Sequence, residues 1–283
     1  MKSNITLQEK FKMLQHQKEA LLATNFYNFE TLKGVLQAAQ SVKKPIILQL
    51  TKSSLEYLGL DVVVRLAKSM LEHYEVEGWI HLDHGGSYEL VASCLDAGFD
   101  SVMIDASEKS FEDNVKLTRS VVKLAEKYGA NVEAELGYIA KLGQRTDKVG
   151  FTEPNDAKHF VEETGVNALA VAIGSAHGFY KGEPHIDLDR LSEIRKVTNA
   201  VLVLHGGSGI PHHVLREAIK RGICKINLAT EIKNIFMMTL KNSLANEDEI
   251  DLRKVFPQAT DAVTELVRNK LLAIQTERNA QIN

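Results

Sequence analysis

Short runs of β-branched and aliphatic residues recur along the chain, and most are separated by segments whose apolar residues have helical spacing. There are eight such runs, and their starts lie roughly 20 to 40 residues apart. A strand, a crossover helix and the next parallel strand need about this separation. The runs are LLATNF from Leu21, IILQL from Ile46, WIHLD from Trp79, SVMID from Ser101, NVEAEL from Asn131, ALAVAI from Ala168, AVLVLH from Ala200 and ICKINL from Ile223.

This repetition predicts an α/β protein in which residues 1–283 form one (β/α)8 barrel, a TIM barrel, as a single domain. Near-continuous apolar runs such as 168–173 fit a parallel sheet that is covered by helices, because neither face of such a sheet meets water. No Pro-, Gly- or Ser-rich stretch marks a boundary between domains. An open, doubly wound sheet is the alternative.

Additional helices are predicted at both ends of the chain. Thr6 and Glu9 have the spacing of a capping box ahead of an apolar stretch, so we expect an N-terminal helix that closes the bottom of the barrel. Residues 251–274 also have helical spacing, with Pro257 as an expected break. We interpret this C-terminal helical extension as a packing or subunit-contact element.

Composition and charge narrow the class of protein. The 283 residues carry 34 Lys plus Arg and 37 Asp plus Glu, a net charge of −3, which excludes a protein that coats nucleic acid or a membrane surface through bulk charge. No apolar stretch has the length of a signal peptide or a membrane span, so we expect a cytoplasmic protein. The two cysteines, Cys94 and Cys224, are expected to be buried core residues.

Polar residues follow the predicted strands at their carboxyl ends, where barrels of this kind build their active sites. Three of them are histidines, His84, His177 and His205, each from a different strand and each followed by glycine. Three imidazoles with an open fourth position form a catalytic divalent-metal site, for which zinc is the first choice. A single histidine is more often an ordinary polar residue, but three at equivalent strand ends favour a metal site.

Carboxylates accompany these histidines. Asp83 precedes His84 and is the best residue to transfer a proton beside a metal, although it fits equally a carboxylate that orients a ligand histidine. Glu133 and Glu135 share one face of their strand, so at least one of them is expected near the metal. An ion pair inside the barrel, with Lys225 as the partner, is the alternative interpretation.

Two small-residue turns follow the seventh and eighth strands. His205-Gly206-Gly207-Ser208-Gly209 and Asn227-Leu228-Ala229-Thr230 lie where these barrels commonly bind phosphate through backbone N–H groups and a helix N-terminus. A metal, a phosphate site and a carboxylate together indicate chemistry next to a carbonyl group.

Six sequence blocks in order resemble the class II, zinc-dependent ketose-bisphosphate aldolases, the fructose- and tagatose-bisphosphate aldolases. The resemblance runs nearly end to end. It implies an oligomeric barrel, a homodimer or homotetramer, that reversibly cleaves a ketose 1,6-bisphosphate, or a related ketose 1-phosphate, into dihydroxyacetone phosphate and an aldehyde. The blocks are IHLDHG from Ile80, SVMIDAS from Ser101, VEAELG from Val132, LAVAIGSAHG from Leu169, LVLHGGSG from Leu202 and ICKINLATE from Ile223.

The resemblance also implies roles for individual residues. His84, His177 and His205 would hold the zinc, Asp83 would exchange a proton with the C4 hydroxyl, and Glu135 matches a carboxylate near the metal. A monovalent cation, sodium or potassium, often accompanies the phosphate site. Thr51 falls where related enzymes have a serine that contacts the distal phosphate. The substrate-binding positions implied are Asn25, Thr51, Gly178, Gly206, Gly207, Ser208, Asn227, Leu228, Ala229 and Thr230.

The chain departs from the family pattern after VEAELG. The family typically continues with a Gly-Gly-Gln-Glu-Asp-Asp loop whose Glu takes a proton from the dihydroxyacetone carbon, but here Arg145 occupies that position. Asp147 is the nearby carboxylate that remains. Either Asp147, Glu135 or another group replaces the Glu, or activity on the usual substrates is weak. Lys141, Arg145 and Lys148 would suit a different anionic substituent on the substrate, and Glu56 stands where close relatives often carry Arg.

Two other functions compete with this one. A Schiff-base aldolase would use Lys225, but would leave the three histidines without a role. A non-catalytic accessory subunit that binds sugar phosphates would keep the barrel and lose the loop carboxylate, as the Arg145 position suggests.

Overall fold

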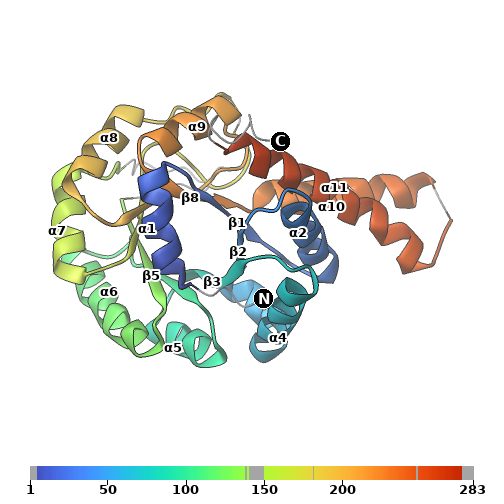
Figure 1. Ribbon diagram of the computed structural model, residues 1–283, viewed down its shortest axis with the longest axis horizontal. Helices are drawn as coiled ribbons and strands as arrows, with labels where there is room; N and C mark the ends of the chain where they lie inside the picture. Colours follow the sequence, from blue (N-terminus) through green and yellow to red (C-terminus); the bar gives the residue numbers. More distant parts are fainter. Residues whose placement is uncertain (1–4, 138, 140–149, 181, 247, 276–283) are drawn as a thin grey trace.

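The computed structural model describes residues 5–137, 139, 150–180, 182–246 and 248–275. Its eight strands are all parallel and pair in chain order, and the first pairs with the last, so the sheet closes into a barrel. Each predicted apolar run coincides with one strand to within two residues at either end, or lies inside it. This confirms the (β/α)8 barrel and excludes the open sheet (Figure 1). The strands are β1 (Leu21–Asn25), β2 (Ile46–Thr51), β3 (Gly78–Gly85), β4 (Ser101–Ile104), β5 (Asn131–Leu136), β6 (Ala168–Val171), β7 (Val201–Leu204) and β8 (Ile223–Leu228).

Helices connect successive strands and surround the barrel (Figure 1). Their buried faces and the outward side chains of the strands form the main hydrophobic core, in which Cys94 is buried; Cys224 is also buried, and neither cysteine forms a disulfide. No helix among the described residues is both long enough and apolar enough to cross a membrane. The connecting helices are α2 (Phe29–Ser41), α3 (Lys52–Leu58), α4 (Leu60–His73), α5 (Tyr88–Ala97), α6 (Phe111–Ala125), η1 (Glu126–Tyr128), α7 (Pro154–Thr164), α8 (Leu188–Val197) and α9 (His212–Lys220).

Helix α1 (Leu7–Gln17) begins at the expected capping box: the Thr6 side chain accepts a hydrogen bond from the Glu9 backbone, and the Glu9 side chain accepts one from the Thr6 backbone. The helix lies across one end of the barrel (Figure 1). Its buried residues Leu7, Phe11 and Leu14 share a hydrophobic cluster with side chains at the amino-terminal ends of the strands. The helix therefore closes the bottom of the barrel and leaves the carboxyl ends of the strands as the mouth.

Helices α10 (Thr230–Asn246) and α11 (Leu252–Ala273) form a pair that projects beyond the barrel (Figure 1). The expected break at Pro257 is wrong, because α11 continues through this residue. Proline removes only its own N–H from the helix, and tight packing against α2 holds the remaining turns in place. At Gly34 of α2 that packing is so close that a Cβ atom would lie 2.8 Å from the Thr260 carbonyl oxygen.

Candidate active site

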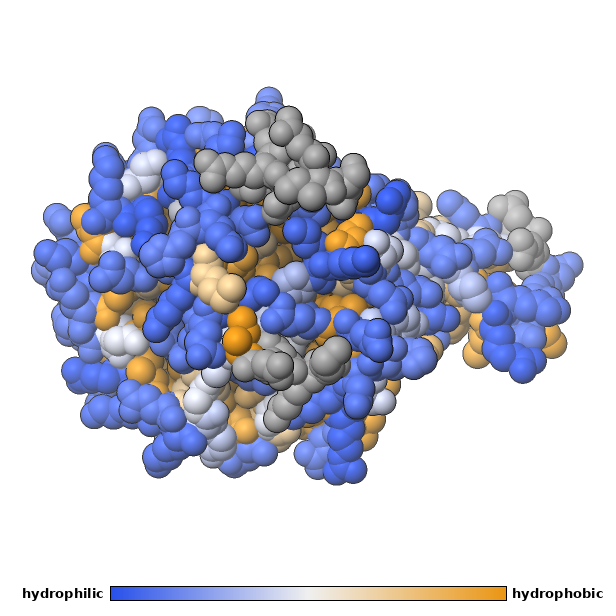
Figure 2. All heavy atoms as spheres, viewed as in Figure 1, coloured by the Kyte–Doolittle hydropathy of each residue, from blue (hydrophilic) through white to orange (hydrophobic). Residues whose placement is uncertain are grey.

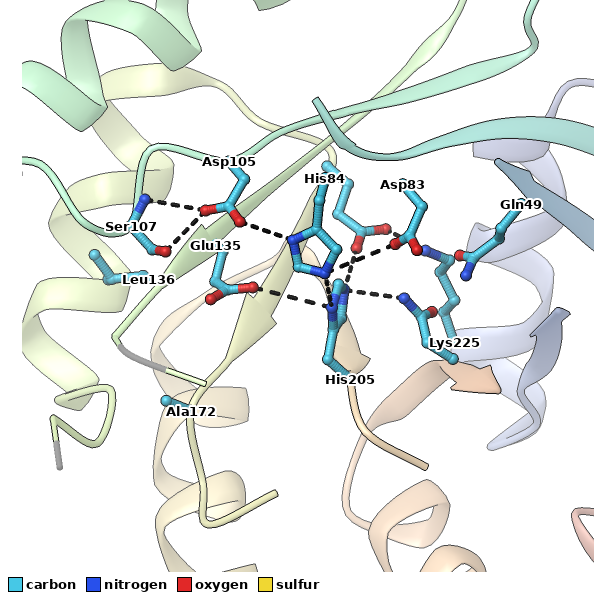
Figure 3. Close-up of polar contacts among 12 residues, drawn as sticks. Gln49, Asp83, His84, Asp105, Ser107, Glu135, Leu136, Ala172, His205 and Lys225 are labelled. Carbon is cyan, nitrogen blue, oxygen red and sulfur yellow. Dashed lines mark hydrogen bonds and ion pairs between the residues drawn. The ribbon is translucent and has the colours of Figure 1, made fainter. Parts of the chain in front are cut away.

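The polar residues singled out in the sequence gather at the mouth and upper interior of the barrel (Figure 3). Asp83 and His84 end β3, Glu135 lies on β5, and His205 follows β7 directly. The sequence placed these side chains at strand ends, and barrel closure brings strands that are distant in the chain to one point.

The three histidines come together as a group. Ring nitrogens of His84, His177 and His205 all lie within 4.8 Å of one another. The ring centroids of His84 and His205 are 4.9 Å apart, and His177 lies 5.1 Å and 5.7 Å from them. Each ring meets its neighbours edge-on, so the nitrogens point toward a shared centre.

Two carboxylates next to His84 fix the orientation of its ring and raise its pKa. Its Nδ1 atom donates to Asp105 Oδ2 at 2.7 Å, and the other oxygen of Asp105 accepts hydrogen bonds from the backbone and hydroxyl of Ser107. Burial alone would lower the pKa of His84, but Asp83 and Asp105 raise that pKa to about 9. The Nε2 atom of His84 is therefore the atom left for a ligand.

The backbone at His84 is also unusual. Its φ of 53° lies in the left-handed region, which a non-glycine residue adopts at a cost that often marks a functional site. The pairing of β3 with β4 shifts register between Leu82 and Gly85. At Gly85 a Cβ atom would lie 2.6 Å from the Met103 carbonyl oxygen, so only glycine permits this close passage. The irregular strand end turns His84 toward the other two histidines.

His205 is fully buried and has a carboxylate on its far side. Its Nε2 atom lies 2.8 Å from Glu133 Oε1 and 3.1 Å from the Asn227 amide. A carboxylate can only accept, so Nε2 carries the proton, and the Asn227 amide is assigned with its oxygen toward this N–H. The Nδ1 atom of His205 then has a lone pair and faces Nε2 of His84 at 3.2 Å, and without a metal the second ring proton of His84 lies between them. A metal ion can replace that proton, because each of the two nitrogens then offers it a lone pair. With His177 as the third nitrogen, the donor set fits zinc with an open position for substrate.

Asp83 is oriented by an amide chain across three strands. Gln49 on β2 donates to Asn25 on β1 at 3.1 Å, and Asn25 donates to Asp83 Oδ2 at 2.9 Å. The Oδ1 atom of Asp83 is buried without a hydrogen-bond partner and lies 3.9 Å from Nε2 of His84. Burial would raise the pKa of Asp83, but the nearby His84, His205 and Lys225 lower it, so this carboxylate is ionised.

Sequence reasoning did not assign a role to Gln49. Its signal was a single amide inside the apolar run IILQL, and the side chain is completely buried. A polar residue that interrupts a buried strand needs a partner within the core, and here the partner is Asn25.

Glu135 faces the same centre from β5. Its Oε2 atom is buried without a hydrogen-bond partner and lies 3.9 Å from Nδ1 of His205. Burial, together with the charge of the neighbouring Asp105, raises the pKa of Glu135 to about 8. Asp147 lies outside the described residues, as do Lys141, Arg145 and Lys148.

A small cleft opens beside the histidines and collects most of the predicted substrate-binding residues. Gly206 and Gly178 have φ values of +68° and +113°, which let the backbone approach this cleft closely. Gly207 does not line the cleft. Its N–H donates to the Asn227 carbonyl at 3.0 Å. The lining consists of Asn25, Asp83, His177, Gly178, Gly206, Ser208, Asn227, Ala229 and Thr230.

Besides Gly207, two more of the predicted binding residues lie outside this lining. Leu228 packs its side chain into the main hydrophobic core, which limits any contact with substrate to its backbone. Thr51 lies at the carboxyl end of β2 and caps α3, where its hydroxyl accepts from the Ser54 backbone at 3.4 Å.

A larger cavity of about 650 Å³ lies at the opposite end of the barrel, between α1, α4 and η1. The histidines and the carboxylates with displaced pKa values lie at the mouth and not there. The smaller cleft is therefore the candidate active site, at the end of the barrel where such folds build theirs.

Lys225 of β8 does not face the cleft. Its ammonium group is buried, lies 2.7 Å from Glu133 Oε2, and is 3.2 Å from Nε2 of His81. A lysine that forms a Schiff base must present an uncharged amine to the substrate. The ion pair with Glu133 argues against this role.

Comparison with known proteins agrees with this geometry. The family model "Fructose-bisphosphate aldolase class-II" matches residues 5–279. The fructose-bisphosphate aldolase of Geobacillus stearothermophilus is 38% identical over 277 residues, which cover 95% of this chain and 96% of the relative. That of Helicobacter pylori (strain ATCC 700392 / 26695) is 37% identical over 282 residues, which cover 88% of this chain and 91% of the relative.

Solved structures share the fold. The crystal structure of the YdjI aldolase from Escherichia coli K12 has a TM-score of 0.86 and 31% identity, and the match covers 97% of this chain and 98% of that one. The fructose-bisphosphate aldolase of Campylobacter jejuni has a TM-score of 0.82 over 95% of both chains at 19% identity, which shows the fold alone.

Proposed function

We propose, since this chain belongs to the class II fructose-bisphosphate aldolase family, that His84, His177 and His205 hold a catalytic zinc ion. The chain is a lyase that cleaves a ketose bisphosphate by aldol chemistry. The observation that carries the metal assignment is the convergence of ring nitrogens from three histidines within 4.8 Å of one another, with His84 Nε2 and His205 Nδ1 3.2 Å apart.

Zinc bound there would polarise the ketone oxygen of the substrate and stabilise the negative charge that develops during cleavage. Asp83 takes the proton from the C4 hydroxyl, because its Oδ1 atom is ionised, has no other hydrogen-bond partner and faces the histidine cluster. As the C4 oxygen forms the aldehyde, the C3–C4 bond breaks and its electron pair remains with the dihydroxyacetone phosphate fragment. In the reverse reaction Asp83 returns the proton.

The dihydroxyacetone fragment must then gain a proton at its C3 carbon. Glu135 and Asp147 are the two carboxyl groups proposed for this step. Glu135 is supported by its position in the barrel and by burial that raises its pKa to about 8, which keeps it protonated near neutral pH in the absence of a metal. A general acid with a pKa near the working pH is the efficient choice.

We assign the phosphate of dihydroxyacetone phosphate to the turn at Gly206–Ser208 and to the segment Asn227–Thr230. Thr230 begins α10 and lines the cleft, so the N-terminus of this helix lies beside it, and helix N-termini attract phosphate. A sodium or potassium ion would offset the phosphate charge. Thr51 remains the proposed contact of the distal phosphate.

A homodimer or homotetramer is proposed for the assembled enzyme. The projecting α10–α11 pair supports this, because it exposes apolar side chains among polar ones (Figure 2). Those with at least two fifths of their surface exposed are Met237, Met238, Leu244, Ile250, Leu252 and Leu272.

The decisive experiment measures dihydroxyacetone phosphate release from fructose 1,6-bisphosphate, tagatose 1,6-bisphosphate and a ketose 1-phosphate. Each substrate is assayed with the untreated protein, with the EDTA-treated protein, and with the treated protein after zinc has been restored. We expect cleavage that EDTA abolishes and zinc restores, and the preferred substrate identifies the sugar. Cleavage that persists in EDTA, together with a covalent substrate adduct that borohydride traps on the protein, would instead support a Schiff base at Lys225. No cleavage by the zinc-loaded protein would favour the accessory subunit.

A further inference from the structure

A buried ion pair contacts one of the proposed metal ligands. The Glu133 carboxylate is completely buried and bridges two groups: Oε2 lies 2.7 Å from Lys225 Nζ, and Oε1 lies 2.8 Å from His205 Nε2. Barrel interiors are usually filled by branched aliphatic side chains, and burying two charges is unfavourable unless further hydrogen bonds complete them. The pair therefore calls for a role beyond filling space.

The hydrogen bonds around Lys225 have one consistent direction. An ammonium group only donates, so Lys225 donates to Glu133 Oε2 and to Nε2 of His81 at 3.2 Å. His81 must then carry its proton on Nδ1, which donates to Ser101 Oγ at 2.7 Å. Asn131 donates to the same hydroxyl oxygen at 3.1 Å. These contacts fix the ammonium group from the side away from the metal.

The chain of hydrogen bonds continues from Lys225 toward the mouth of the barrel. Because Lys225 occupies Oε2, the carboxylate of Glu133 presents Oε1 to His205 in a fixed orientation. Oε1 accepts the proton of Nε2, which leaves Nδ1 of His205 without a proton and aimed at Nε2 of His84, 3.2 Å away. A ring rotated by half a turn would place a C–H, and the other tautomer would place an N–H, where a metal ligand is needed.

We propose that Lys225 is a positioning residue for the metal: it fixes the Glu133 carboxylate, which in turn holds the His205 ring with Nδ1 toward the metal. This inference rests on the three-histidine site proposed above. Lys225 touches neither substrate nor metal, so its effect is transmitted entirely through Glu133. Removing the ammonium group leaves Oε2 without its donor and frees the carboxylate to turn away from His205.

The test uses the full-length protein and the variant Lys225→Met, which keeps the length of the side chain and removes its donors. Zinc affinity is measured by competition with a chromophoric chelator, and the visible spectrum of the cobalt-substituted protein reports the ligand geometry. We expect zinc binding to weaken roughly 10- to 100-fold, as is typical when a partner of a ligand histidine is lost, and the cobalt bands to change.

Lys270→Met is the matched control. Lys270 is also a mostly buried lysine in an ion pair, with Glu231 at 3.0 Å, but no proposed metal ligand contacts it. Its loss is expected to lower stability while zinc affinity and the cobalt spectrum stay as in the parent protein. A folded Lys225→Met protein with parental affinity and spectrum would overturn the inference. If the parent itself bound neither zinc nor cobalt, the metal site and not only this inference would be wrong.

A second measurement covers the case in which Lys225→Met does not fold. In the zinc-loaded parent protein labelled with 15N-histidine, long-range proton–nitrogen spectra report which ring nitrogen of His205 bears the proton. We expect a proton on Nε2 and metal at Nδ1, and the same pattern in Lys225→Arg, which keeps a donor. A proton on Nδ1 in the parent, or a folded Lys225→Arg with a reversed His205 tautomer, would overturn the inference.

Discussion

Asn25 donates a hydrogen bond of 2.9 Å to Oδ2 of Asp83, while Oδ1 of the same carboxylate is buried without a partner. The amide thereby decides which oxygen is free to act on substrate. Gln49 fixes the amide in turn through its bond to Asn25 Oδ1 at 3.1 Å. One strand supplies the base and two neighbouring strands supply its orientation.

Asp83→Asn is expected to lower kcat for ketose bisphosphate cleavage by roughly 10²- to 10⁴-fold, the usual loss when a general base is removed. Asn25→Ala should cost less, roughly 10- to 100-fold, because it removes one hydrogen bond to a charged group. The measurement is steady-state kinetics with zinc in excess. Because Asn25 is expected to act through Asp83, the double variant should be no slower than Asp83→Asn alone. Multiplying losses would show that Asn25 acts independently.

The sequence was sufficient for the barrel and for the gathering of the three histidines. Eight near-continuous apolar runs are a strong signal, and strand ends of a closed parallel sheet meet at one face whatever the details. The side-chain contacts within the site could not be predicted in the same way. Asp105 was visible as a polar residue after a strand, but its bond to His84 depends on the register shift between β3 and β4.

Interior partners were harder still to predict. Glu133 was expected to lie near the metal or to pair with Lys225, and it lies 2.8 Å from His205 while pairing with Lys225 at 2.7 Å. Which strands face each other across the barrel follows from strand tilt, which one sequence does not specify. At Pro257 the sequence predicted a feature that the structure lacks. The local signal for a helix break was strong, but packing against α2 overrides it.

His177→Ala is expected to weaken zinc binding by more than about 100-fold, beyond the loss caused by removing a supporting partner. His177 is one of the three converging nitrogen donors, so its loss leaves two ring nitrogens for the metal. Zinc content after dialysis and chelator competition measure the effect. His185→Ala is the control, because His185 lies outside the three-histidine group. Full zinc retention by His177→Ala would remove it from the ligand set.

Once its metal has been removed, the protein is expected to lose free energy of unfolding as pH rises from about 7 to about 9. Without a cation, Asp83 and Asp105 raise the pKa of His84 from 6.5 to about 9, and burial raises the pKa of Glu135 from 4.5 to about 8. A raised folded-state pKa gives stability that is complete below the unfolded value and is lost as pH passes the folded one. His81 and His205, whose pKa values lie below 6.5, add no further change in this range.

The loss should be on the order of 2 to 4 kcal/mol, seen as a lower thermal midpoint of the EDTA-treated protein at the higher pH. Zinc-loaded protein should show a much smaller change, because the metal replaces the protons. Asp105→Asn should flatten the slope of the metal-free protein, since it removes one of the charges that raise the pKa of His84. Equal slopes with and without zinc would contradict the assignment of these groups to the metal site.

Lys270→Met is expected to lower the free energy of unfolding by about 3 kcal/mol, because it leaves the mostly buried Glu231 carboxylate without its cation. Glu231 also accepts a hydrogen bond from the Gly209 backbone, a contact that does not include the ammonium group, so KM for the phosphorylated substrate is expected to stay as in the parent protein. Urea unfolding of zinc-loaded protein and steady-state kinetics measure these two quantities. Lys254→Met is the control on the same helix, since its pair with Glu249 is largely exposed and should contribute less than about 1 kcal/mol. Equal losses in the two variants would mean that burial of the Glu231 pair is not what makes Lys270 important.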